Sequence, residues 1–179
     1  NKTKGHWEYY QVPLIPAGPS RVADGFPIIE NEIVVNSVGH FICANDLMTG
    51  DSLWAVDCEN NFVFGGFFIH EGYVYAMAEA RALYCFDLET GQECWRMDDD
   101  GLGTTSQMVH HNGVIYFASG GNGRLMAVDM ETGELLWNIK SPDNESFNLE
   151  IAIWPGDEDR SARVLTATYE SVLAYDVVR

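Results

Sequence analysis

The chain has 179 residues, of which 46% are hydrophobic, so it is long and apolar enough to bury one domain-sized core. It carries 27 acidic and 10 basic residues, a net charge of −17. This charge repels phosphate backbones and anionic lipid headgroups, which excludes nucleic acid and membrane surfaces as favoured partners. No apolar stretch approaches the roughly 18–20 residues that span a bilayer. We therefore expect a soluble protein with an acidic surface and no membrane span.

The first predicted element is a strand at residues 5–12, Gly5-His-Trp-Glu-Tyr-Tyr-Gln-Val12. It resembles the last strand of the repeats that follow, and Trp7 precedes Trp54 by 47 residues. It is predicted to be the outer strand of a sheet whose other strands lie elsewhere in the chain. The first residues of the given sequence contain no initiator methionine, basic n-region or apolar h-region. Asn1 is interpreted as the processed end of an exported protein or as a cut within a longer one.

Three eleven-residue segments then repeat in register. They read Ala44-Asn-Asp-Leu-Met-Thr-Gly-Asp-Ser-Leu-Trp54, Cys85-Phe-Asp-Leu-Glu-Thr-Gly-Gln-Glu-Cys-Trp95 and Ala127-Val-Asp-Met-Glu-Thr-Gly-Glu-Leu-Leu-Trp137, and a fourth begins at Ala174-Tyr-Asp176. The aspartates are 41, 42 and 47 residues apart, and the tryptophans repeat the first two steps. The spacing predicts repeats over residues 26–58, 66–98, 105–140 and 149–179, of which the last is incomplete.

The shared Asp-x-x-Thr-Gly pattern predicts a tight hairpin turn in each repeat. The aspartate carboxylate can accept hydrogen bonds from backbone N–H groups within the turn, and the glycine supplies the positive φ that a short hairpin loop needs. Alternating apolar residues on both sides make this a β-hairpin. The residues in these roles are Asp46, Asp87, Asp129 and Asp176, with Gly50, Gly91 and Gly133.

Two more strands are predicted before each hairpin. They lie at Phe26–Ile29 and Ile33–Asn36, at Gly66–Ile69 and Tyr73–Met77, and at Ser106–Val109 and Val114–Ala118. Runs such as Val114–Ala118 are apolar at every position, whereas a sheet with one wet face would alternate. Each four-stranded antiparallel sheet should therefore lie between two others. The expected fold is an all-β propeller with about four blades present.

The pattern Ala-x-Asp-x-x-Thr-Gly-x-x-x-Trp resembles the tryptophan-docking motif of the quinoprotein-like (PQQ-like repeat) propeller family, which includes the BamB-type outer-membrane-assembly lipoproteins. The resemblance covers residues 26–179. It implies that the motif tryptophan stacks between blades, against the peptide plane around the motif glycine of a neighbour. The residues with this implied blade-docking role are Trp7, Trp54, Trp95 and Trp137, with Gly50, Gly91 and Gly133.

Dehydrogenases of this family hold pyrroloquinoline quinone (PQQ) and calcium beneath an adjacent Cys-Cys pair. This sequence has no such pair, so no catalytic, cofactor-binding or metal-binding residue is carried over, and no cofactor is expected.

The two chain ends leave three arrangements open. The chain is a segment of a longer propeller, or two copies form an eight-bladed ring as a homodimer, or the strand with Trp7 completes the last blade of a four-bladed ring.

The other segments that could bind a metal ion or a phosphate, or act as an acid or base, are predicted to be turns or surface residues. Asp98-Asp-Asp-Gly101 and Asp157-Glu-Asp159 offer carboxylates to calcium but lack the ligand spacing of a known loop, so solvated turns are favoured. His110-His111 corresponds to Ile69-His70 and Ile29-Glu30 in other repeats, so His111 is predicted at a turn and surface histidines are favoured over ligands. Gly120-Gly-Asn-Gly123 is predicted to be a hairpin turn.

Cys85 and Cys94 occupy motif positions one and ten, which should lie opposite each other across the hairpin. A disulfide between them is one hypothesis, and two small core side chains, like Ala44 and Leu53 in the first repeat, are the favoured alternative. Cys43 and Cys58 belong to no CxxC pair or zinc pattern.

The resemblance implies a non-enzymatic binding or scaffold module for a protein partner, periplasmic or extracellular. Fold alone does not establish function, and the competing prediction is a fragment of a PQQ-dependent dehydrogenase. The expected contact regions are the loops Asp98–Thr105, Ser141–Asn148 and Trp154–Ala162. Trp154 lies outside the docking register, and a structural plug and a partner contact remain equally open for it.

Overall fold

The computed structural model describes residues 27–58, 66–78, 82–99, 106–119, 123–142, 145–147 and 150–178. In this part of the chain the regular elements are antiparallel strands in four sheets. We call the sheets blades 1 to 4. Blade 1 has β1 (Ile28–Glu30), β2 (Ile33–Val38), β3 (Phe41–Asp46) and β4 (Ser52–Asp57). Blade 2 has β5 (Phe67–His70), β6 (Tyr73–Ala78), β7 (Ala82–Asp87) and β8 (Glu93–Asp98).

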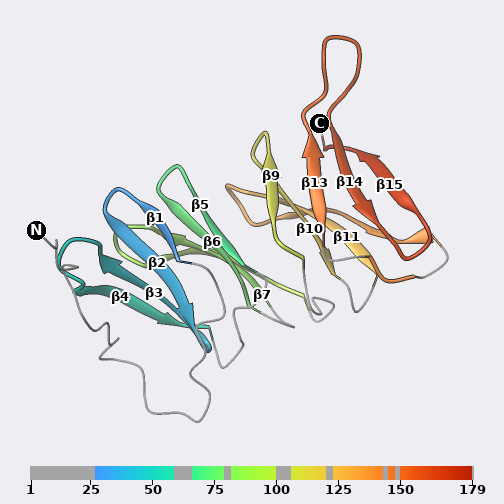
Figure 1. Ribbon diagram of the computed structural model, residues 1–179. Helices are drawn as coiled ribbons and strands as arrows, with labels where there is room; N and C mark the ends of the chain where they lie inside the picture. Colours follow the sequence, from blue (N-terminus) through green and yellow to red (C-terminus); the bar gives the residue numbers. More distant parts are fainter. Residues whose placement is uncertain are drawn as a thin grey trace, which may run out of the picture.

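Blade 3 has β9 (Val109–His111), β10 (Val114–Ser119), β11 (Arg124–Asp129) and β12 (Leu135–Lys140), and blade 4 has β13 (Ile151–Trp154), β14 (Arg163–Ala167) and β15 (Val172–Asp176). Each sheet pairs its strands in chain order, as a meander. The blades stand side by side along an open arc, from β1–β4 at one end to β13–β15 at the other (Figure 1). The expected all-β propeller blades are confirmed.

The core is divided among the three junctions between blades. In β10, Val114, Tyr116 and Ala118 pack toward blade 4, whereas Ile115 and Phe117 pack toward blade 2. The strand is therefore buried on both faces, as its continuous apolar sequence predicted. Each fully buried large apolar side chain contributes about 1.5–3 kcal/mol, so the junctions supply most of the stability.

A β-bulge distinguishes the motif hairpins from a regular ladder. In blade 2, Cys85 pairs with Trp95 and Phe86 pairs with Glu93, which leaves Cys94 as the extra residue. The same shift occurs in blade 1, where Ala44 pairs with Trp54, and in blade 3, where Ala127 pairs with Trp137. The predicted pairing of Cys85 opposite Cys94 is thus wrong, because the bulge moves the tryptophan into that place.

One further local prediction differs from the structure. His111 is the last residue of β9 and pairs with Val114, and the turn itself is formed by Asn112 and Gly113. Asp176 occupies the position at the end of β15 that Asp46, Asp87 and Asp129 occupy at the ends of β3, β7 and β11, and its role in a turn stays a prediction. It lies opposite Arg163, and its Oδ1 lies 3.2 Å from Nη2 of that arginine.

The predicted strand at residues 5–12, with Trp7, lies outside the described residues, and so do most of the loop Asp98–Thr105 and residues 120–122. The split-blade arrangement therefore stays a proposal. In the part of the chain that the structure describes, no helix is long and apolar enough to cross a membrane.

Candidate functional site

The three motif turns share one hydrogen-bonding pattern. In blade 2, Oδ1 of Asp87 accepts from the backbone N–H of Thr90 at 2.8 Å and from its hydroxyl at 2.6 Å. The N–H of Gly91, at a φ of 69°, donates to the carbonyl of Asp87 at 2.9 Å. Asp46 and Asp129 accept in the same way from the turns of blades 1 and 3. Aspartate, threonine and glycine thus satisfy the turn locally.

These hydrogen bonds lower the pKa of the turn aspartates below its ordinary value. The main cause is the backbone N–H of Thr49 for Asp46, the hydroxyl of Thr90 for Asp87 and the backbone N–H of Thr132 for Asp129. A carboxyl whose pKa is lower in the folded than in the unfolded state stabilises the fold at pH values above its unfolded-state pKa of about 3.9. This stabilisation is lost as the pH falls through the folded-state pKa.

We therefore expect the triple variant Asp46→Asn, Asp87→Asn, Asp129→Asn to lose less thermal stability than the wild type between about pH 5 and pH 2.5. Each asparagine keeps an acceptor oxygen but does not titrate. Melting temperature against pH, followed by circular dichroism, measures the difference, and parallel curves for the two proteins would contradict it.

Each of the first two motif tryptophans lies on the turn of the next blade. Nε1 of Trp54 donates to the carbonyl of Leu88 at 2.8 Å, and a Cβ added to Gly91 would lie 2.6 Å from Cδ2 of the indole. Nε1 of Trp95 donates to the carbonyl of Met130 at 3.0 Å, and a Cβ at Gly133 would lie 2.5 Å from its Cε3. Both indoles therefore rest on a peptide plane that only glycine leaves open.

The other residues with an implied docking role are placed differently. Trp137 is half-buried in the junction of blades 3 and 4, with its ring centroid 5.7 Å from that of Tyr116. Gly50 has a φ of 79° and donates to the carbonyl of Asp46 at 2.8 Å. We propose that the tryptophan contacts hold neighbouring blades together.

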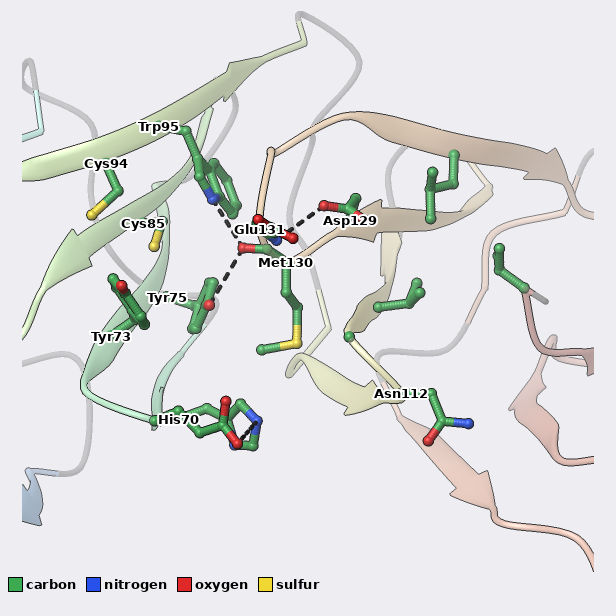
Figure 2. Close-up of a pocket in the computed structure, with 15 residues that line it drawn as sticks. His70, Tyr73, Tyr75, Cys85, Cys94, Trp95, Asn112, Asp129, Met130 and Glu131 are labelled. Carbon is green, nitrogen blue, oxygen red and sulfur yellow. Dashed lines mark hydrogen bonds and ion pairs between the residues drawn. The ribbon is translucent and has the colours of Figure 1, made fainter.

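An open groove lies at the junction of blades 2 and 3, with a volume of about 1020 Å³. We call it the junction groove. Blade 2 lines it with His70, Glu71, Tyr73, Tyr75, Cys85, Cys94 and Trp95, blade 3 with Asn112, Gly113, Val114, Asp129, Met130, Glu131 and Leu136, and the chain end with Val178. Figure 2 shows Trp95 and Tyr75 converging on the Met130 carbonyl in its wall. The sequence analysis missed this groove because its residues come from positions up to 108 apart.

Titratable groups in and beside the groove have shifted pKa values. Burial raises the pKa of Tyr75, whose hydroxyl lies 3.4 Å from the Met130 carbonyl. Burial also lowers the pKa of His110, and the neighbouring His70 and His111 lower it further. The rings of His110 and His70 lie 4.4 Å apart across the junction, and Phe68 stacks on His110 at 5.1 Å. His110 is exposed, as the sequence predicted, and one side of its ring contacts Phe68 and His70 of blade 2.

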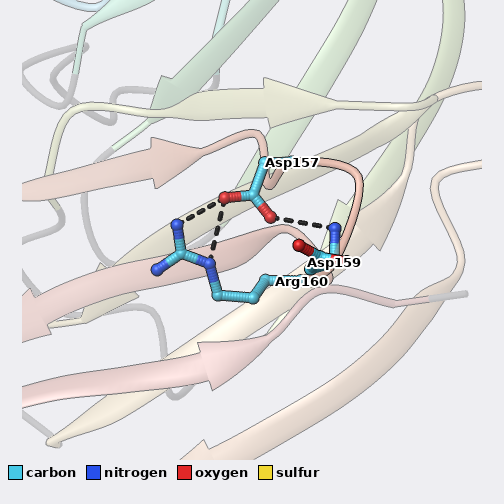
Figure 3. Close-up of polar contacts among 3 residues, drawn as sticks. All are labelled: Asp157, Asp159 and Arg160. Carbon is cyan, nitrogen blue, oxygen red and sulfur yellow. Dashed lines mark hydrogen bonds and ion pairs between the residues drawn. The ribbon is translucent and has the colours of Figure 1, made fainter.

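Arginine side chains contact the aspartates that the sequence offered as possible calcium ligands. Asp98 lies 2.8 Å from Arg96, and Asp99 lies 3.7 Å from Arg124. Asp157 accepts from Nε of Arg160 at 3.0 Å and from the backbone N–H of Asp159 at 3.1 Å, as Figure 3 shows. Within the described residues, no group of three histidine, cysteine or acidic side chains is arranged to hold a metal ion.

Trp154 contributes to the same loop. The guanidinium of Arg160 lies 4.7 Å from the centre of its ring, a cation–π contact. Because Asp157 fixes the same arginine, the half-buried Trp154 helps to organise the loop between β13 and β14.

The four cysteines are free thiols that differ in exposure. Cys43, Cys58 and Cys85 are buried, and burial raises the pKa of each to about 12, whereas Cys94 is exposed on the bulge. Since the thiolate is the reactive form, we expect iodoacetamide at pH 8 to modify only Cys94 in the folded protein. Peptide mass spectrometry locates the label. Protection of both Cys85 and Cys94 after unfolding without reductant would instead reveal a disulfide.

Comparison with known proteins agrees with this geometry. A family model described as outer membrane protein assembly factor BamB matches residues 7–178. A search of curated protein sequences finds no significant match.

Among solved structures, BamB from Moraxella catarrhalis matches with a TM-score of 0.68 and 16% identity, over 87% of this chain and 50% of that one. The computationally designed Ika4 protein matches with a TM-score of 0.69 and 16% identity, over 90% of this chain and 94% of that one. A quinohemoprotein alcohol dehydrogenase from Pseudomonas putida HK5 matches with a TM-score of 0.64 and 16% identity, over 84% of this chain and 32% of that one.

These structural likenesses show the fold, and the chain spans about half the length of the BamB structure that it matches. The family model covers nearly the whole sequence. The turns, the blades and this match lead to one conclusion: the chain belongs to the PQQ-like repeat propeller family described as outer membrane protein assembly factor BamB.

Proposed function

We infer that the chain is a protein-binding scaffold module of the extracytoplasmic space, with no catalytic step of its own. The observation that supports this most is the match of a BamB family model to residues 7–178. The geometry is compatible with this role. The regular motif residues form the turns and the contacts between blades. The groove and exposed apolar side chains such as Met48, Tyr73 and Tyr169 are therefore the expected sites of contact with a partner.

Site-specific photocrosslinking tests this proposal. A benzophenone amino acid replaces Met48 or Tyr73, at the motif-turn end of the strands, or Tyr169, in the turn between β14 and β15 at the opposite end. Expressed in the envelope of the source organism, the chain should give one discrete adduct with an envelope protein from one end of the strands only. The absence of any adduct from all three positions would overturn the scaffold proposal.

The alternative is a fragment of a PQQ-dependent dehydrogenase, since quinoprotein dehydrogenases share the fold. Titration of the chain with PQQ and calcium, followed by absorbance and dye reduction with an alcohol, separates the two. Saturable binding with turnover would support the dehydrogenase, and we expect neither.

We also propose that a further blade of the same repeat covers the face of blade 4 that points away from blade 3. Leu165 is partly exposed there, whereas the corresponding Val35, Tyr75 and Tyr116 are at most 4% exposed, and Val172 is 83% exposed. A solution mass of about twice 20.0 kDa would assign the blade to a second copy in a ring-closing homodimer. A 20 kDa monomer would assign it to a longer form of the chain, and blade 4 capped by residues 5–12 alone would overturn the proposal.

A further inference from the structure

We propose that the junction groove binds an extended peptide segment of the partner in which lysine or arginine alternates with apolar residues. This rests on the proposed scaffold function, because it presupposes a protein partner and specifies the chemistry of the bound segment. It follows from three features of the groove: its prearranged aromatic wall, its acidic rim, and the difference between this junction and the preceding one.

The aromatic wall is fixed before any ligand arrives. Nε1 of Trp95 and the hydroxyl of Tyr75 both donate to the carbonyl of Met130, at 3.0 and 3.4 Å, and the two ring centroids lie 6.0 Å apart. Tyr73 and Leu136, at 42% and 37% exposure, extend this apolar surface to the mouth of the groove. A wall whose side chains are already ordered gives up little entropy when it binds apolar groups.

The rim is negative. Glu71, Asp129 and Glu131 line the groove, and the described lining residues include neither lysine nor arginine. The Glu71 side chain is 83% exposed, with its Oε1 3.9 Å from Nε2 of His70, so its carboxylate is accessible to a cation. The net charge of −17 steers basic segments toward the chain and disfavours phosphate-bearing ligands.

Arginine and lysine side chains can interact with both the acidic rim and the aromatic wall of the groove. Their charged groups interact with carboxylates, and they also sit favourably over aromatic faces such as Tyr73. The exposed Asn112, in the turn at the mouth, offers an amide donor and acceptor to a peptide backbone. An alternating extended peptide presents its basic side chains to one side and its apolar side chains to the other.

The preceding junction provides a comparison within the same chain. Register places Ile33 and Val35 of blade 1 where blade 2 has Tyr73 and Tyr75. The turns of that junction carry Glu32 and Glu89, so it is acidic but lacks the two tyrosines. The preceding junction therefore keeps the acidic turns and a tryptophan, Trp54, but has aliphatic side chains in place of the two tyrosines.

Fluorescence anisotropy with labelled acetyl-RLRLRL-amide and the full chain tests the proposal. We expect saturable binding that weakens with added salt, since the rim charges are exposed. The double variant Glu71→Gln, Glu131→Gln should weaken binding about 5- to 10-fold, and Tyr73→Ala about 10-fold. The matched control Glu32→Gln, Glu89→Gln removes the same charge one junction away and should change the affinity less than about 2-fold. Unchanged circular dichroism spectra and melting temperatures verify that the variants fold.

Two comparison peptides decide among the outcomes. Acetyl-ELELEL-amide should not bind, and acetyl-RSRSRS-amide should bind at least about 10-fold more weakly, because it lacks apolar side chains. Equal weakening by both double variants, equal binding of the two arginine peptides, or no binding of the RL peptide overturns the groove proposal. If photocrosslinks to an envelope protein persist in that case, the scaffold function stands and its partner binds elsewhere. If the crosslinks are absent as well, both proposals fail.

Discussion

Replacement of Trp54 by alanine is expected to lower the free energy of unfolding by about 3–5 kcal/mol, the range for truncating a buried tryptophan. The indole is 7% exposed and belongs to the core between blades 1 and 2. Its loss leaves a cavity against the turn of blade 2 and leaves the Leu88 carbonyl without the indole N–H that donates to it at 2.8 Å. Urea denaturation followed by circular dichroism measures the change.

The matched control is Leu53→Ala. Leu53 is the neighbouring residue on the same strand and is 46% exposed, so its truncation should cost less than about 1 kcal/mol. Similar losses for the two variants would show that Trp54 does not hold the blades together. In a repeat architecture the damage should concentrate at one junction, and hydrogen exchange should rise first in β3, β4 and the facing strands of blade 2.

The second large effect is expected for Gly91→Ala. The new Cβ would lie 2.6, 2.7 and 2.9 Å from three indole atoms of Trp54, and the backbone has a φ of 69°. The left-handed conformation alone costs about 1–2 kcal/mol with a side chain. Displacement of the indole should bring the total to about 3–5 kcal/mol, measured by the same urea denaturation.

Gly72→Ala isolates the cost of conformation. Gly72 has a φ of 81°, and nothing lies within 4 Å of its added Cβ, so only the cost of about 1–2 kcal/mol applies. A double-mutant cycle sharpens the test, because Gly91→Ala should cost no more than Gly72→Ala once Trp54 is alanine. If Gly91→Ala is equally costly with and without Trp54, the contact between them is not the cause.

The sequence predicted the turns well because their interactions are local. The carboxylate of Asp87 and the Gly91 N–H make their hydrogen bonds within a few residues. The period of about 41 residues, together with strands that are apolar throughout, was enough to predict stacked four-stranded blades.

The bulge could not be predicted from alternation alone. Counting residues across the turn placed Cys94 opposite Cys85, but the register shift gives that place to Trp95. The same one-residue shift occurs in blades 1 and 3, and in blades 1 and 2 it accompanies an indole that lies on the glycine of the next blade. The contact between Asp176 and Arg163 could not be predicted either, because it follows from strand pairing and not from the motif.

The sequence by itself determined the repeat, the hairpin turns and the two-sided burial of the strands, because these depend on neighbouring residues and on a simple period. Only the tertiary structure decided which side chains meet between blades. The junction groove unites Tyr73 and Trp95 with Glu131 of the next blade, and His70 meets His110 across the same junction. Such contacts depend on how two separately formed sheets stack, and no local pattern in either sheet contains that information.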